Sequence, residues 1–240
     1  MWSPYRLFRG DEVDEAPSLS GARAPGCQDC SGATAPKRPD REALVRQAFR
    51  LEYLSVAWML IEAAVAIASG VRAGSVSLLA FGIDSLIELA SALVLIWRLS
   101  VELRHGREFG EGAERAASRI AGGLLVALAA YVVAAAAWKL RARAGGGFSW
   151  PGLIVTALAM PVMYPLARRK LAVAEALGSR AMRADAMESA ACFWLSLVVV
   201  VGQLVQAASG AWWVDAVTSL GIVWLLVREG RAAWRGEACC

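Results

Sequence analysis

The chain has 240 residues, of which 58% are hydrophobic, and a formal net charge of +4. Soluble domains are about 45–50% apolar. Together with a mean hydropathy of +0.48, the composition therefore excludes an ordinary soluble domain and indicates a membrane protein. The basic residues border apolar stretches and do not alternate with aromatic residues, which favours a membrane surface as their partner and excludes a nucleic acid.

Residues 1–40 are rich in Gly, Pro, Ala and charge without apolar periodicity, so we expect a disordered cytoplasmic tail. Cys27 and Cys30 within it form a CQDC pair, which could bind a soft metal but supplies only half of a tetrahedral site. An incidental pair in a flexible segment is the alternative. The terminal Cys239 and Cys240 leave the same two alternatives open, with a frayed end favoured.

Residues 41–230 are expected to form an all-α membrane protein domain, a six-transmembrane-helix bundle, followed by a short cytoplasmic tail at 231–240. Its first segment, Arg41–Tyr53, mixes basic and apolar residues at helical spacing, as in a helix at the membrane interface. A bilayer core of about 30 Å needs about 20 mostly apolar helical residues. The stretches expected to span it are Leu54–Val71, Val76–Trp97, 120–140, Pro151–Ala167, Ala184–Ala207 and Trp213–Val227.

The connections between the spans are expected to be polar. A tight RAGS turn joins the first two spans, and a polar stretch runs from Arg98 to Arg119. That stretch contains His105, the only histidine, which we expect to be solvated and not a metal ligand. A second polar link is expected between Arg168 and Met182.

Two acids lie near the middle of the second span, Asp84 and Glu88. An acid in a membrane span costs about 2.5–3.5 kcal/mol on insertion scales, so it usually faces a cavity or a partner. At positions i and i+4 the two side chains share one helix face, where like charges repel. A bound cation would remove that repulsion.

The fifth span carries a second pair at the same spacing, Glu188 and Cys192. Carboxylate oxygen and thiolate sulfur both ligate zinc-like divalent metals, and four such groups complete a tetrahedral site. The second and fifth spans run antiparallel in a six-span bundle. We therefore expect Asp84 to lie level with Cys192, and Glu88 level with Glu188.

These residues make the chain resemble the cation diffusion facilitators, also called cation efflux proteins. In that family the second span typically carries an acid or histidine, three residues and an acid, matched here by AFGIDSLIE. The fifth span carries a similar pair after Ala-Asp-Ala, matched by ADAMESAAC, although the family commonly has His and Asp where this chain has Glu188 and Cys192. The stretches GVRAGSVSLLA and DAVTSLGIVWLLVREG are also similar, so the likeness covers most of residues 54–230.

Three further acids lie in or near the spans. Glu62 and Asp185 are candidates for contacting the metal ligands or relaying protons. For Glu62, a protonated side chain that hydrogen-bonds a neighbouring helix is a third alternative. Asp215, near the start of the sixth span, is expected to cap that helix or to meet interfacial water.

Basic residues predict the orientation of the bundle. Those that flank the spans on the side of the two termini outnumber those on the other side, so by the positive-inside rule both termini are cytoplasmic. The resemblance implies the same topology. Members of the family often have a cytoplasmic metal-binding domain after the last span. We do not expect such a domain in the short stretch at 231–240.

We therefore expect a secondary transporter, not an enzyme, that exports zinc or a similar thiophilic cation across the plasma membrane against protons. No Walker-type loop suggests use of a nucleotide, and no cofactor other than the transported cation is expected. Its partners would be the bilayer, the metal ion, protons and a second copy in a homodimer. The alternative is a noncatalytic scaffold or sensor whose neutral intramembrane acids hold helices together. A membrane enzyme is disfavoured because no general base constellation is visible.

Overall fold

The computed structural model describes residues 38–105 and 111–235, and the described residues form helices without strands. In chain order the helices are α1 (Arg38–Ala73), α2 (Val76–His105), α3 (Glu111–Ala142), α4 (Trp150–Leu177), α5 (Arg180–Ser209) and α6 (Val214–Arg235). The expected all-α class is confirmed. The predictions for Cys27, Cys30, Cys239 and Cys240 and for nearly all of the tail at 1–40 lie outside the described residues.

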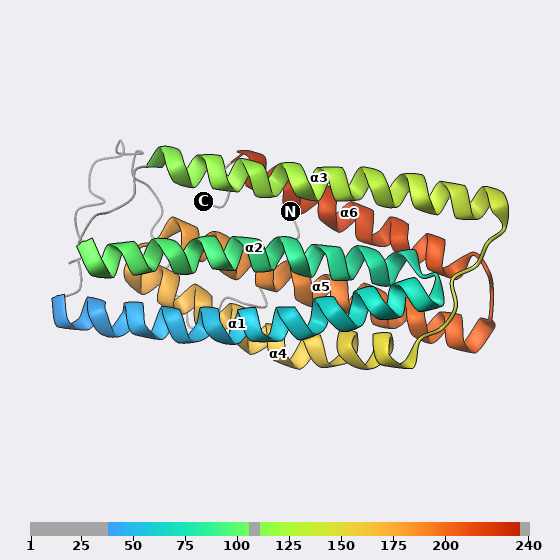
Figure 1. Cartoon of the computed structure of the whole chain (residues 1–240), viewed down its shortest axis with the longest axis horizontal. Helices are drawn as coiled ribbons and strands as arrows, with labels where there is room; N and C mark the ends of the chain where they lie inside the picture. Colours follow the sequence, from blue (N-terminus) through green and yellow to red (C-terminus); the bar gives the residue numbers. More distant parts are fainter. Residues whose placement is uncertain (1–37, 106–110, 236–240) are drawn as a thin grey trace, which may run out of the picture.

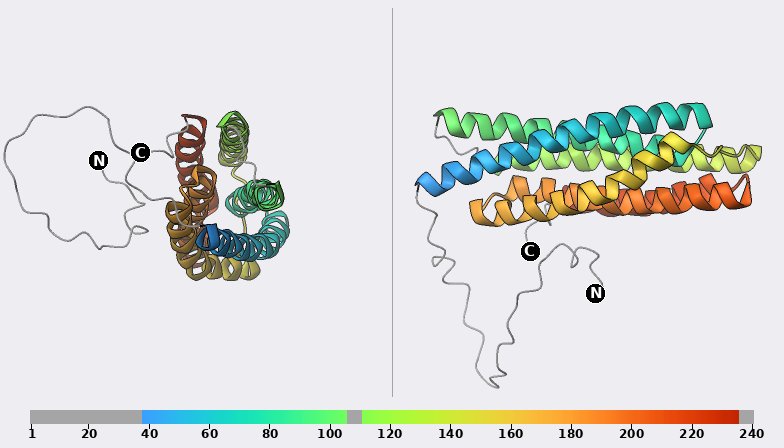
Figure 2. Two further views of the ribbon diagram at one scale, coloured as in Figure 1. Left: turned by 90° about the vertical axis from the view of Figure 1, so that its left-hand side faces the viewer. Right: turned by 90° about the horizontal axis from the view of Figure 1, so that it is seen from below.

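The helices pack side by side in layers. α2 and α5 form a middle layer, with α1 and α4 on one side of it and α3 and α6 on the other (Figures 1 and 2). In the most apolar stretch of α5, 56% of the residues are buried, and the value for α2 is 44%, the two highest of the candidate spans. Side chains that face inward from α2 or α5 are therefore enclosed by protein on several sides.

Five described helices are long and apolar enough to cross a membrane, through Arg41–Ala73, Val76–Val101, Gly122–Ala142, Trp150–Leu177 and Ala181–Ser209. α6 differs from them because it has an acid in its first turn and charged residues near its end, which shorten its apolar stretch. The sixth expected span is thus a helix of the bundle, but its length and composition alone do not define it as a span.

Two stretches predicted as polar connections are mostly helical. The stretch from Arg98 to Arg119 is helical on both sides of residues 106–110, and His105 is the last residue of α2. The link from Arg168 to Met182 is shorter than predicted, since α4 continues to Leu177 and α5 begins at Arg180. The physical reason is that α4 keeps a buried face through LARRKLAVAEAL, on which Leu166, Lys170, Val173 and Leu177 all lie. Arg41–Tyr53, expected at the interface, is continuous with the first span in α1.

Glycines allow close approach between neighbouring helices. A Cβ atom at Gly82 would lie 2.7 Å from Ile67 Cγ1 of α1, and one at Gly202 of α5 would lie 2.3 Å from Thr218 Cγ2 of α6. Both distances are shorter than atoms tolerate. Small residues at such contacts are typical of helix packing in membranes.

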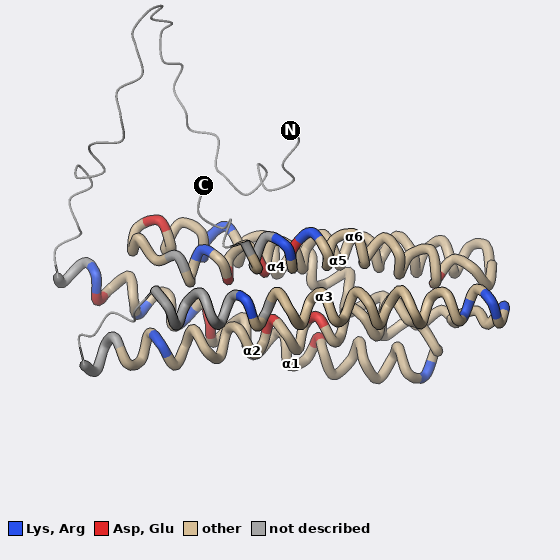
Figure 3. The backbone as a smooth tube through the Cα atoms, turned by 90° about the horizontal axis from the view of Figure 1, so that it is seen from above, with Lys and Arg blue, Asp and Glu red and all other residues tan. Residues whose placement is uncertain are grey.

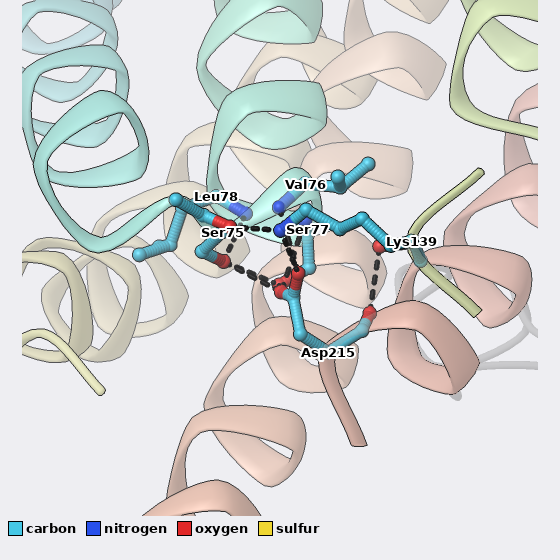
Figure 4. A network of polar contacts seen from close by, with 8 residues as sticks. Ser75, Val76, Ser77, Leu78, Lys139 and Asp215 are labelled. Atoms are coloured by element: carbon cyan, nitrogen blue, oxygen red, sulfur yellow. Dashed lines mark hydrogen bonds and ion pairs between the residues drawn. The ribbon is translucent and has the colours of Figure 1, made fainter. Parts of the chain in front are cut away.

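The N-terminus of α2 is held by an acid from a different helix. Ser75 caps α2, since its Oγ accepts from Leu78 N at 3.2 Å. Asp215 of α6 accepts hydrogen bonds from Ser75 Oγ at 2.6 Å, Val76 N at 2.8 Å and Ser77 Oγ at 2.7 Å (Figure 4). A carboxylate is favoured there because the N-terminus of a helix carries a partial positive charge and unpaired N–H groups.

Asp215 therefore caps α2, whereas the sequence predicted a cap on its own helix or contact with interfacial water. The side chain is 4% exposed, and Lys139 Nζ of α3 lies 3.4 Å from its Oδ2. Lys139 also donates to the carbonyl oxygen of Gly74 in the turn before α2. The cluster ties α2, α3 and α6 together at one end of the bundle.

Charged residues divide between the ends and the interior. The last turns of α3 and α1 are basic, with Lys139 and Arg141 in α3 and Arg72 in α1, and Figure 3 shows Lys and Arg at these helix ends. Acidic residues lie midway along the bundle, where α1 and α2 run side by side. Some of the buried acids line a cavity between the helices.

Candidate cation site

A small cavity lies among α2, α3, α5 and α6, with a volume of about 30 Å³. Four acidic side chains line it: Asp84 and Glu88 of α2, Glu188 of α5 and Glu229 of α6. The rest of the lining is mainly apolar and consists of Ile87, Leu125, Ala191, Trp194, Leu195, Leu225 and Leu226. A cavity of this size has room for one or two water molecules or a metal ion. Carboxylates gathered in apolar surroundings disfavour one another's charge, and a cation relieves that cost.

The two acids of α2 are well buried. Asp84 is 7% exposed and Glu88 is 4% exposed. Ser189 Oγ of α5 donates to Glu88 Oε1 at 3.0 Å. This bond places the residue after Glu188 level with Glu88, so the acids of the middle layer lie at matching depth.

Glu188 carries an unused acceptor at the cavity. Its Oε2 atom is buried and has no hydrogen-bond partner among the described residues. The indole nitrogen of Trp194, one of the lining residues, is likewise buried without a described partner. An unsatisfied buried polar atom costs free energy, so Glu188 Oε2 is well suited to accept a substrate cation or a water molecule bound to one.

Cys192 does not line the cavity and lies beside Glu62 of α1. The thiol donates to Glu62 Oε1, with Sγ 3.4 Å from the oxygen. Glu62 is fully buried and also accepts from Ser85 Oγ at 2.7 Å and from Trp58 Nε1 at 2.5 Å. Glu62 thus accepts hydrogen bonds from the neighbouring helices α2 and α5, and it contacts one predicted ligand, Cys192, directly.

Asp185 is turned away from the cavity. Its Oδ2 lies 2.5 Å from Nζ of Lys170 in α4, which also lies 3.1 Å from Glu52 Oε2 of α1. Asp185 therefore contacts an ammonium group and none of the predicted ligands by hydrogen bond in the described part of the chain.

The four predicted ligands are close but not gathered. Within residues 38–105 and 111–235, no three His, Cys, Asp or Glu side chains are drawn together tightly enough to hold a metal ion. Asp84, Glu88 and Glu188 share the cavity, and Cys192 follows Glu188 by one helical turn.

Two polar groups near the cavity were missed from the sequence. Glu229 lies just after the expected sixth span, which ends at Val227, and was given no role, although it follows Leu225 and Leu226 at helical spacing. Lys170 was assigned to a polar link, although it shares a helix face with Leu166 and Val173. In both cases the apolar residues three or four positions away indicate that the residue lies on the buried face of a helix.

The bundle and its acidic cavity define a helical membrane protein suited to bind cations. Residues 53–235 match the cation efflux transmembrane domain. The chain therefore belongs to the cation efflux family, as its motifs predicted, and is a secondary transporter of divalent cations and not an enzyme. Among curated proteins, no match is found.

Proposed function

We propose that this protein exports zinc, or a similarly thiophilic divalent cation, in exchange for protons. The observation that carries the proposal is the cavity where Asp84, Glu88 and Glu188 meet, with one buried carboxylate oxygen of Glu188 lacking a described partner. Oxygen ligands alone suit many divalent ions. The preference for thiophilic ions depends on Cys192.

Cys192 can join the carboxylates because it lies on the same helix as Glu188 and one turn away. Its thiol donates a weak hydrogen bond to Glu62, with 3.4 Å between Sγ and Oε1. A soft thiolate favours zinc and cadmium over manganese and magnesium. In the proposed bound state the cation draws Asp84, Glu88, Glu188 and Cys192 together.

Proton exchange follows from the ligand chemistry. Carboxylates and thiols must lose their protons before they ligate a metal, so binding releases protons and protonation releases the metal. Glu62 accepts the hydrogen bond of the Cys192 thiol, so it is in place to take up a proton that the thiol releases. This contact supports Glu62 as the first member of a proton path.

The proposed topology is a six-span bundle in the plasma membrane with cytoplasmic termini, assembled as a homodimer. The distribution of Lys and Arg supports this orientation, because basic residues are more frequent on the cytoplasmic side of membrane spans. Alternating access would expose the cavity to each side in turn by movement of packed helices. The α3 and α6 layer contributes Leu125, Leu225, Leu226 and Glu229 to the cavity, so its displacement would open the site.

The noncatalytic scaffold is less well supported. Acids that only hold helices together should have their oxygens paired, as those of Glu62 are. Glu188 Oε2 has no described partner and therefore contributes nothing to packing through that atom.

Zinc uptake into proteoliposomes with an imposed pH gradient tests the proposal. Asp84→Asn and Glu88→Gln should each lower the initial rate by about tenfold or more, since each removes a ligand charge. Glu42→Gln is the matched control, because Glu42 is 65% exposed on α1 and pairs with Arg46 at the helix surface. Wild-type rates in both cavity variants, or zinc uptake that does not depend on the pH gradient, would contradict the proposal.

A further inference from the structure

A buried group of three charges lies beside the cation site. Lys170 of α4 and Glu52 of α1 are fully buried, and Asp185 of α5 is 4% exposed. The ammonium nitrogen lies 3.1 Å from Glu52 Oε2 and 2.5 Å from Asp185 Oδ2. We refer to Glu52, Lys170 and Asp185 as the lysine triad.

The lysine triad has more acceptor capacity than Lys170 uses. Glu52 Oε1 and Asp185 Oδ1 are both buried and have no hydrogen-bond partner among the described residues. Two carboxylates face one ammonium group. The free energy needed to remove these charges from water can exceed the attraction between them. Packing alone would be served as well by apolar residues, so the triad calls for another explanation.

The triad is close enough to the cavity to act on it. Asp185 precedes Glu188 by three residues on α5, and side chains at that spacing are neighbours with Cβ atoms about 5–6 Å apart. Lys170 Nζ contacts Asp185, one helical turn before Glu188, and Glu188 lines the cavity together with Glu88. Asp185 itself is absent from the lining because it points to Lys170.

We propose that Lys170 is a tethered cation that withholds Asp185 from the transported ion and lowers the affinity of the cavity for it. This inference rests on the proposed function, since it assumes that the cavity binds a divalent cation. Lys170 occupies the acceptor that Asp185 would otherwise turn toward the cavity. Its positive charge also repels the incoming ion, which speeds release.

Two variants that differ only in the charge of residue 185 isolate the effect of Asp185. E52Q/K170M removes one negative and one positive charge together, so the net charge of the triad is kept while Asp185 loses its partner. E52Q/K170M/D185N then removes the charge of Asp185 as well. Zinc and cadmium dissociation constants are measured for both by calorimetry on purified protein in detergent micelles, beside the wild type.

The expected result is that E52Q/K170M binds zinc about tenfold or more tightly than the wild type, because an unpaired carboxylate is gained and a nearby cation is lost. D185N in that background should reverse the gain. In proteoliposomes E52Q/K170M should show a lower KM and a lower kcat for zinc. Wild-type or weaker affinity in E52Q/K170M would overturn the inference.

A single variant tests the inference even if the double variant folds poorly. Asp185→Asn alone leaves Lys170 with Glu52 only, so the positive charge near the cavity is less compensated and zinc affinity should fall several-fold. A triad that serves packing alone predicts a lower melting temperature with an unchanged dissociation constant, which would also overturn the inference. If the wild type binds no zinc or Asp84→Asn binds it equally well, the proposed function fails instead.

Discussion

Asp215 should be among the most sensitive positions for stability. Its carboxylate accepts from Ser75 Oγ at 2.6 Å, Ser77 Oγ at 2.7 Å and Val76 N at 2.8 Å, and a weaker bond from Ser77 N at 3.3 Å. Hydrogen bonds to a charged group contribute about 1.5–3 kcal/mol each. They are not additive, and breaking one buried charge cluster typically costs about 3–5 kcal/mol. We expect Asp215→Ala to lower the free energy of unfolding by that amount.

Asp215→Asn should cost less, about 1–3 kcal/mol, because its one amide oxygen still accepts while its NH2 group faces donors. Ser149→Ala is the matched control: Ser149 caps α4 from within its own sequence by one bond of 3.3 Å from Gly152 N. Such a cap contributes about 1 kcal/mol. Equilibrium unfolding in mixed micelles, followed by tryptophan fluorescence, measures all three. A loss below about 1 kcal/mol in Asp215→Ala would refute the assigned role.

Three further predictions concern the site and its packing. Cys192→Ser should lower the ratio of cadmium to manganese affinity by about tenfold or more, since a hydroxyl is a harder ligand; an unchanged ratio in competitive binding would exclude the thiolate from the site. Glu62→Gln should keep zinc binding but uncouple zinc uptake from an imposed pH gradient, and intact coupling would assign Glu62 to packing. Gly202→Leu should destabilise the α5–α6 contact by about 1–3 kcal/mol or more, because even a Cβ atom would lie 2.3 Å from Thr218; unchanged unfolding would show that this contact is looser.

Apolar length and the spacing of the acids predicted the main architecture. Residues 76–97 and 184–207 lie within α2 and α5, the middle layer, and these helices carry Asp84, Glu88 and Glu188 to one cavity. These acids face inward because a membrane helix hides its acids from lipid, so an i, i+4 pair of acids indicates an inward face. The ends of the helices were harder to predict, since α2 and α4 continue past their apolar segments.

The polar contacts between distant helices were not predictable from local pattern. Lys170 follows Arg168 and Arg169 and was grouped with them in a polar link. Of the three, only Lys170 is on the buried face of α4. Asp215 looked like a cap for α6 because caps are usually local. Its bonds reach across about 140 residues of sequence, which no spacing rule within one helix reveals.

Zinc X-ray absorption spectroscopy tests the central claim most directly, namely that the cation is held between α2 and α5. It is recorded on a chain in which Cys192 is the only cysteine left, with Cys27, Cys30, Cys239 and Cys240 replaced by Ser. The account predicts bound zinc with one sulfur at about 2.3 Å and oxygens at about 2.0–2.2 Å, lost when Asp84 and Glu88 are neutralised together. Zinc that stays bound with an unchanged ligand shell in that double variant would contradict it.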